Sequence, residues 1–254
     1  MSSTALVDAH CHFDLFQNPQ QVIQEAERNR IHSIAVTNTP SVFDPMRRLT
    51  RGLRYVHPAL GLHPELAIQR ASEIPIFQRK LPDTRYVGEV GLDYKVVVRP
   101  SERARQRAIF QSILRRCANA GGRILTIHSR RAEADVVAAV SEYQPGPFIL
   151  HWYSGSLKTL VVALAAGAFF SVNAAMVRSK RGRRLIQEIP LDRVLTESDG
   201  PFVLLNGQPA GPSSVGDVAR ELARIRGADL EQVRENIFAN LKALWNATSQ
   251  RPVA

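Results

Sequence analysis

The sequence is poor in cysteine and contains no long apolar run. Its two cysteines, Cys11 and Cys117, exclude a disulfide framework. The segment from Met1 to Asp8 lacks the basic start and apolar stretch of a signal peptide. The longest apolar tract, Leu160 to Val172, is too short to span a bilayer, and Gly167 divides it into a helix end and a buried strand. We therefore expect a cytoplasmic protein without a membrane segment.

Acidic residues are fewer than basic residues. The chain has 33 Lys and Arg against 23 Asp and Glu, which gives a formal net charge of +10. A basic surplus attracts polyanions and is common among nucleic-acid-binding proteins. A surplus that only keeps the protein in solution explains the same count, so the charge favours a nucleic-acid partner without establishing one.

No repeat, low-complexity tract, linker or glycine-rich dinucleotide motif interrupts the chain, which we treat as one domain over residues 1–254. Short apolar runs recur as eight expected strands: Ala5–His10, Ser33–Thr37, Tyr55–Leu60, Tyr86–Gly91, Ile124–His128, Pro147–His151, Ala168–Val172 and Arg193–Thr196. This alternation with helical patterns predicts an α/β fold, a closed (β/α)8 barrel, with a doubly wound open sheet as the alternative.

Helices are expected where apolar residues recur every three or four positions. Two such patterns are Ile109, Ile113, Leu114 and Cys117, and Ala134, Val137, Ala138 and Ser141. Two further helices, Asp217–Arg226 and Leu230–Trp245, follow the last strand and would close the ring. The Pro- and Gly-rich stretch Asn206 to Pro212 is expected to be a loop on the active face.

The first expected strand ends in a pair of histidines. His10 and His12 stand two residues apart, so strand alternation points both imidazoles into the barrel and turns Cys11 outward. A single buried histidine is often a hydrogen-bonded core residue. A pair at the carboxyl end of a barrel strand, where such enzymes build their sites, indicates metal ligands instead.

Other strand ends carry further candidate ligands. Glu89 lies inside an apolar strand between Gly88 and Gly91, where an unpaired carboxylate would be costly and a bridging metal ligand resolves the cost. His128 and His151 close the fifth and sixth strands, and Asp199 follows the eighth. Six imidazole and carboxylate ligands exceed the need of one catalytic zinc, so we expect two divalent ions, Mg, Mn or Zn, in a phosphoryl-transfer site.

Six motifs make the chain similar to the TatD family of metal-dependent deoxyribonucleases, within the amidohydrolase-like TIM barrel superfamily. They are DAHCHFD at Asp8 to Asp14, GLHP at Gly61 to Pro64, GEVGLDY at Gly88 to Tyr94, IHSR at Ile127 to Arg130, HWYSG at His151 to Gly155 and TESDGPF at Thr196 to Phe202. The resemblance covers nearly the whole chain. It implies a (β/α)8 barrel that hydrolyses DNA from its 3′ end, and we expect a 3′–5′ exonuclease that acts on single-stranded or frayed DNA ends.

The resemblance also assigns roles to the motif residues. It implies that His10, His12, Glu89 and Asp199 bind one metal ion, that Glu89, His128 and His151 bind the second, and that His63 lies near the scissile phosphate. The chain departs from the family pattern at Glu65, Trp152 and Ser198. Because no departure removes a ligand, these positions bear on substrate preference more than on catalysis.

Two segments resemble a narrower branch, the TatD-like nucleases of the Qat antiphage defence system. They are FFSVNAAMVRSKRGR at Phe169 to Arg183 and SRRA at Ser129 to Ala132. This resemblance implies a bacterial protein in antiviral defence that works with partner proteins of a defence complex.

Several residues around the expected metals bear on substrate binding and catalysis. Cations in loops after the strands would ring the mouth and attract a phosphate backbone: Arg99, Arg130, Arg131, Arg178, Lys180 and Arg181. Tyr153 shares the parity of His151 and could stack on a terminal base, although core packing fits it, and Trp152, as well. Glu197 suits an acceptor behind the metal ligands. Asp199, besides binding metal, is expected to accept a proton from the attacking water.

Two other functions fit the same residues. One is an amidohydrolase that acts on small amides, lactones or phosphotriesters, against which the basic mouth and the glutamate in place of a bridging lysine both argue. The other is a weakly active metal-binding scaffold subunit of a complex. Metal-dependent shortening of DNA from its 3′ end would distinguish the nuclease from both.

Overall fold

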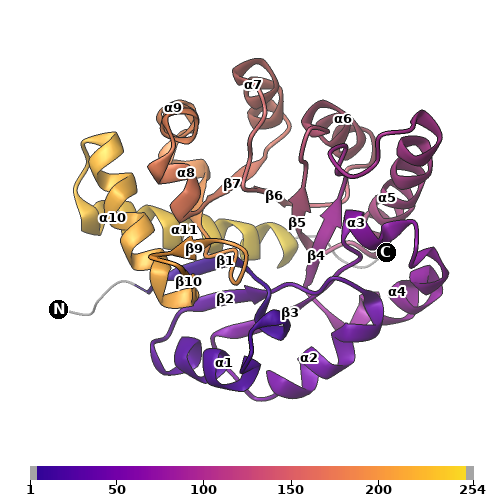
Figure 1. Ribbon diagram of the computed structural model, residues 1–254, viewed down its shortest axis with the longest axis horizontal. Helices are drawn as coiled ribbons and strands as arrows, with labels where there is room; N and C mark the ends of the chain where they lie inside the picture. The colour runs from indigo at the N-terminus through magenta and orange to yellow at the C-terminus, as the bar shows by residue number, and fades with distance from the viewer. Residues whose placement is uncertain (1–4, 250–254) are drawn as a thin grey trace.

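The computed structural model describes residues 5–249, so the first four residues of the N-terminal segment discussed above lie outside it. Its centre is an eight-stranded parallel sheet in sequential order (Figure 1). The strands are β1 (Val7–Cys11), β2 (His32–Ala35), β3 (Val56–Leu60), β4 (Tyr86–Gly91), β5 (Ile124–His128), β6 (Phe148–His151), β7 (Phe169–Val172) and β8 (Val194–Thr196). The predicted barrel with helices between its strands is confirmed.

Helices alternate with the strands and surround the sheet (Figure 1). They are α1 (Pro19–Arg28), α2 (Phe43–Leu49), α3 (Pro64–Ala67), α4 (Ile74–Lys80), α5 (Pro100–Ala120), α6 (Glu133–Tyr143), α7 (Leu157–Ala165), α8 (Ala174–Arg178), α9 (Lys180–Glu188), α10 (Val215–Arg226) and α11 (Leu230–Ser249). No helix within residues 5–249 is long and apolar enough to cross a membrane.

The two ends of the sheet meet through bonds outside the regular strand ladder. The hydroxyl of Thr196 donates to the carbonyl of Val7 at 2.5 Å, and the amide of Asp199 donates to the carbonyl of His10 at 2.9 Å. The first bond joins the carboxyl end of β8 to the amino end of β1, and the second lies at the carboxyl end of β1. They bring the Asp199 loop beside His10 and His12.

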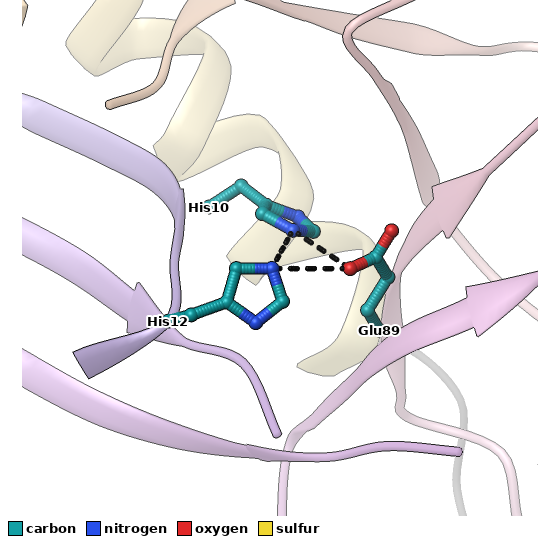
Figure 2. Close-up of side chains that lie close together, drawn as sticks. All are labelled: His10, His12 and Glu89. Atoms are coloured by element: carbon teal, nitrogen blue, oxygen red, sulfur yellow. Dashed lines mark hydrogen bonds and ion pairs between the residues drawn. The ribbon is translucent and has the colours of Figure 1, made fainter. Parts of the chain in front are cut away.

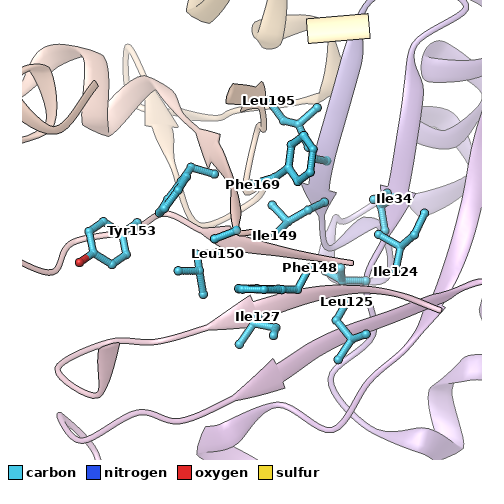
Figure 3. Packing of buried hydrophobic residues seen from close by; sticks show 14 of the residues in the cluster. Ile34, Ile124, Leu125, Ile127, Phe148, Ile149, Leu150, Tyr153, Phe169 and Leu195 are labelled. Carbon is cyan, nitrogen blue, oxygen red and sulfur yellow. The ribbon is translucent and has the colours of Figure 1, made fainter. Parts of the chain in front are cut away.

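Apolar side chains fill the inside of the sheet and the space between sheet and helices. Leu125, Ile149, Phe169 and Leu195, from four different strands, belong to one buried cluster (Figure 3). Burial of each such side chain stabilises the fold by about 1.5–3 kcal/mol. A smaller cluster around Phe13 packs between α1 and the first strands and includes Cys11, in agreement with its predicted burial.

Two details differ from the sequence prediction. Ala134, Ala138 and Ser141 of α6 are exposed, and the helix buries Val136, Val137, Ala139 and Val140 instead. The segment after the last barrel strand is not only a loop, since β9 (Leu204–Leu205) pairs antiparallel with β10 (Gln208–Pro209). The turn between them has positive φ angles at Asn206 and Gly207, which suits a two-residue hairpin turn.

Candidate metal centre

Two histidines meet inside the barrel, His10 on β1 and His12 directly after it. Both are buried, and their Nε2 atoms lie 3.3 Å apart (Figure 2). On its other side, the His10 ring places Nδ1 2.7 Å from the hydroxyl of Thr126 on β5. A neutral His10 that donates from Nδ1 to Thr126 presents the lone pair of Nε2 to the space that it shares with His12.

Glu89 enters this space from β4. Its Oε2 lies 3.3 Å from Nε2 of His10 and 3.2 Å from Nε2 of His12 (Figure 2). The glycine before it is required by close packing, because a Cβ at Gly88 would lie 2.1 Å from the Thr126 methyl group. The strand therefore approaches β5 closely where it presents the carboxylate.

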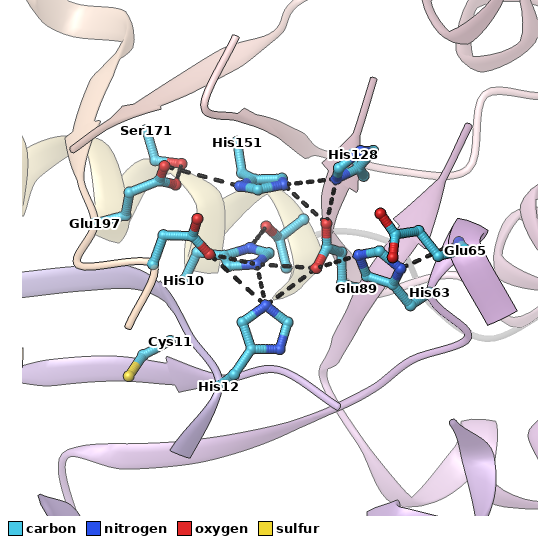
Figure 4. A network of polar contacts seen from close by, with 12 residues as sticks. His10, Cys11, His12, His63, Glu65, Glu89, His128, His151, Ser171 and Glu197 are labelled. Carbon is cyan, nitrogen blue, oxygen red and sulfur yellow. Dashed lines mark hydrogen bonds and ion pairs between the residues drawn. The ribbon is translucent and has the colours of Figure 1, made fainter. Parts of the chain in front are cut away.

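The second oxygen of Glu89 faces a different pair of histidines. Its Oε1 lies 2.6 Å from Nδ1 of His128 and 2.8 Å from Nε2 of His151, and these two nitrogens are 3.2 Å apart (Figure 4). The rings of His10 and His151 stack at 3.9 Å between centroids, so the two groups of nitrogens adjoin. One carboxylate thus stands between two sets of imidazoles.

Asp199 completes the group on the β1 side. Its Oδ1 lies 3.8 Å from Nε2 of His10 and 3.7 Å from Nε2 of His12. The residue has a left-handed backbone with φ of 46°. Buried Asp8 holds the preceding loop, because it accepts hydrogen bonds from the amide of Ser198 at 2.8 Å and from its hydroxyl at 2.6 Å.

His63 lies at the opening of the same group. Its Nε2 is 3.2 Å from Oε2 of Glu89, and its Nδ1 accepts a hydrogen bond from the amide of Glu65 at 3.1 Å (Figure 4). Its position at the start of α3 leaves the ring partly exposed to the cavity. The arrangement is compatible with the role near a phosphate that the sequence suggested for it.

Two acidic residues lie behind the histidines. Asp93 is fully buried and places Oδ2 2.9 Å from Nε2 of His128. Glu197 lies 3.8 Å from Nδ1 of His151 and accepts hydrogen bonds from the side chains of Asn173 and Ser171. Sequence reasoning anticipated Glu197 but missed Asp93 and Thr126. The signal for Asp93 was its place in GLDY, four residues after Glu89.

The electrostatics of the centre follow from its burial. Burial lowers the pKa of His10 well below its ordinary value. Burial also opposes the charge on Glu89, but the surrounding His63, His151 and His10 outweigh it and hold the pKa of that carboxyl well below its usual range. Burial raises the pKa of Asp199 well above its usual range.

The donor set fits divalent cations. The nitrogens of His10 and His12 face each other and a carboxylate oxygen at 3.2–3.3 Å, an arrangement of lone pairs that a shared cation satisfies. The same holds for His128, His151 and Oε1 of Glu89. Three overlapping groups within residues 5–249 bring ligand atoms close enough to hold an ion: His10, His12 and Glu89; His10, His151 and Glu197; and His63, Glu89 and His128.

A cavity of about 540 Å³ opens above these groups. Its wall includes Glu65, Arg130, Trp152 and Phe202 in addition to the candidate ligands. Of the six cations expected around the mouth, Arg130 lines the cavity, whereas Arg99 pairs with Glu102. Arg181 instead donates to the carbonyls of Ser154 and Gly155, which fixes the loop after β6.

The expectation that Tyr153 stacks on a base is wrong. Its side chain is 1% exposed, packs on Phe170 with 5.4 Å between ring centroids, and donates its hydroxyl to the carbonyl of Ser156. Trp152, for which the sequence also allowed core packing, is 37% exposed and lines the cavity. The reason is the backbone: Trp152 has φ of 40°, so strand alternation ends at His151.

Comparison with known proteins gives a consistent picture. The family model described as TatD related DNase matches residues 7–246. The human protein named deoxyribonuclease TATDN3 is 25% identical over 265 residues, covering 96% of this chain and 96% of that protein. The Bacillus subtilis protein named uncharacterized metal-dependent hydrolase YabD is 26% identical over 255 residues, covering 94% of this chain and 98% of the relative.

A solved structure has a similar fold. The crystal structure of YJJV, a TatD homolog from Escherichia coli, superposes with a TM-score of 0.84 at 24% identity. The match covers 95% of this chain and 98% of that one. The two proteins therefore share the same fold over nearly their whole length.

Proposed function

The chain belongs to the family of TatD-related DNases, as a metal-dependent hydrolase, and on that premise we propose that it is a 3′–5′ exodeoxyribonuclease that uses two divalent ions. The observation that carries the proposal is the division of Glu89. Its Oε2 faces His10 and His12 while its Oε1 faces His128 and His151. Two sets of nitrogen ligands with one shared carboxylate match a paired-ion site for phosphoryl displacement.

Six residues would hold the ions. His10, His12, Glu89 and Asp199 would bind one, and Glu89, His128 and His151 would bind the other. Mg, Mn and Zn are all compatible with this mixture of imidazole and carboxylate ligands. Bound there, the ions would neutralise phosphate charge and lower the pKa of a water molecule.

The protein's own groups supply proton transfer and orientation. Asp199 lines the cavity beside the β1 histidines, where its carboxylate would accept the proton of the attacking water. His63, in the wall of the cavity, would contact the scissile phosphate. Arg130 is exposed on the same cavity and would bind a neighbouring phosphate.

DNA fits this cavity better than a small neutral substrate. The opening carries Arg130 on a chain with net charge +10, and both attract a polyanion. The ligand between the two sets of histidines is Glu89, whereas the amidohydrolase alternative would favour a lysine there. Each candidate ligand lies on a strand of the eight-stranded sheet or within three residues after one, which supports the proposal that residues 1–254 act as one catalytic unit.

The resemblance of Phe169 to Arg183 and of Ser129 to Ala132 to the Qat branch supports a place in cytoplasmic antiphage defence beside partner proteins. In the structure, the first segment forms β7, α8 and the start of α9, and the second leads from β5 into α6. Both follow strand ends on the side of the cavity. A partner that binds them would lie next to the DNA.

The direct test is cleavage of end-labelled DNA. With Mg or Mn, the purified protein is expected to shorten single-stranded DNA from the 3′ end, and chelation should stop it. In parallel, Asp199→Asn should keep bound metal, measured by elemental analysis, and lose at least about a thousandfold in turnover. Cleavage by Asp199→Asn at the normal rate would place the base elsewhere, and absence of DNA cleavage under every metal would refute the nuclease.

A further inference from the structure

Two aromatic side chains are exposed in the wall of the metal cavity. Trp152, directly after the ligand candidate His151, is 37% exposed, and Phe202, three residues after Asp199, is 57% exposed. The Phe202 ring lies 5.0 Å from the His12 ring, nearly perpendicular to it. Large aromatic groups are normally buried, so their exposure beside a polar centre indicates a ligand that covers them.

The local structure turns Trp152 toward the cavity. The left-handed backbone at Trp152 lets the buried Tyr153 take the core position behind it. Gly155 makes room for Tyr153, since a Cβ there would lie 2.3 Å from the tyrosine hydroxyl. The hydroxyl is anchored on the carbonyl of Ser156 at 2.9 Å. Trp152 is thus held on a turn that is fixed from behind.

The charged groups around the two aromatic rings indicate which kind of ligand covers them. Arg130 opens on the same cavity, and the metal-facing histidines and carboxylates form its floor. A ligand that covers both rings must carry flat apolar groups and negative charge at once. An unpaired nucleotide has this combination, because its base stacks on aromatic rings and its phosphate binds cations.

We propose that Trp152 and Phe202 form a stacking subsite for the unpaired bases on either side of the scissile phosphate. Each ring directly follows or contacts a candidate metal ligand, so a base on it belongs to a nucleotide next to the reacting bond. Bases within a duplex are held by pairing and by stacking on their neighbours and must be released before they can stack on the two rings, so the subsite selects single-stranded and frayed ends over blunt duplexes. This inference rests on the proposed nuclease function and assigns the expected preference for single-stranded or frayed ends to two side chains.

The test compares kcat/KM of the wild type, Trp152→Ala, Trp152→Tyr and Phe202→Ala on three single-stranded oligonucleotides. One is unmodified, and each of the others has an abasic nucleotide at one of the two positions flanking the first scissile bond. Leu204→Ala is the control, because Leu204 is exposed on the neighbouring hairpin and does not line the cavity.

Trp152→Ala is expected to lower kcat/KM on the unmodified strand about tenfold or more, and Trp152→Tyr to restore most of it. On one of the two abasic strands, the kcat/KM of the wild type should fall to the value that Trp152→Ala shows on the unmodified strand. On that abasic strand, Trp152→Ala should lower kcat/KM no further. Phe202→Ala should show the same behaviour at the other position. The preference of the wild type for single strands over blunt duplexes should shrink in both variants.

The subsite would be overturned if Trp152→Ala lowered kcat/KM by the same factor on all three strands. It would also be overturned if Trp152→Ala had the same kcat/KM as the wild type on the unmodified strand. Full activity of the aromatic variants on DNA with an unchanged strand preference would show that the rings cover another ligand, such as a partner protein. Each of these results leaves the nuclease proposal standing. That proposal fails separately, if the wild type cleaves no strand at all.

Discussion

At the scale of the residue, Asp93 is a side chain that does not face the candidate metal site but can change its affinity for metal. Its Oδ2 lies 2.9 Å from Nε2 of His128, and its Oδ1 accepts a hydrogen bond from the amide of Lys95 at 2.8 Å. This pairing leaves Nδ1 of His128 to face Glu89. A carboxylate behind a metal-binding imidazole fixes the ring and raises its basicity.

We expect Asp93→Asn to weaken the affinity for Mn²⁺ about 10–100-fold, because the amide keeps the shape but loses the charge. The change is measured by calorimetric titration of the metal-free protein. Glu102→Gln is the control, since Glu102 pairs with Arg99 outside the cavity. Unchanged affinity in Asp93→Asn would show that the carboxylate does not support His128.

Strand alternation predicts side-chain direction only while the strand lasts. It placed His10 and His12 together, and the structure has both facing Glu89. It failed at Tyr153, because the chain leaves the strand at Trp152 through a left-handed residue that no local pattern announces. Thr126 was missed because its hydrogen bond to His10 joins residues far apart in the sequence.

At the scale of the element, the docking of α11 on the start of β2 depends on a neutral histidine. The His32 ring lies 5.3 Å from Phe238 and 5.4 Å from Trp245, both on α11. Burial, with smaller contributions from His57 and Arg54, lowers the pKa of His32 to about 4. In the unfolded chain the same imidazole titrates at its ordinary value of 6.5.

Because the unfolded state binds this proton more readily, stability should fall as the pH drops from about 6.5 to 4. His32 is half-buried, so its contribution is reduced by solvent screening to about 1–2 kcal/mol. Urea unfolding at pH 7 and pH 4.5 is expected to show a smaller loss in His32→Phe than in the wild type. The same loss in both proteins would contradict this role of His32.

The elements themselves were largely predictable. The eight expected strands agree with the structure to within two residues at each end, since each is a short apolar run between polar loops. The spacing of Ala134, Val137, Ala138 and Ser141 predicted a helix, which is α6, but of these four residues only Val137 is buried, because alanine and valine occur on several sides of the helix. The hairpin of β9 and β10 is too short for periodicity to show.

At the scale of the whole molecule, the order of the strands brings the site together. The sheet runs in sequence order from β1 to β8, and the last strand returns to the first through Thr196 and Val7. Ligand candidates from β1, β4, β5 and β6 and from the loop after β8 consequently share one end of the barrel. The strand-end positions were visible in the sequence. The division of the ligands around Glu89 was implied only by the family resemblance, and the distances between their atoms were not predictable, because they depend on side-chain rotamers and on packing across the barrel.

The central claim is that Glu89 stands between two bound cations. Anomalous diffraction from crystals soaked in Mn²⁺ tests it most directly. We expect two peaks, one bounded by His10, His12, Asp199 and Oε2 of Glu89, and the other by His128, His151 and Oε1 of Glu89. A single peak at saturating Mn²⁺, or a second peak that does not contact Glu89, would contradict it.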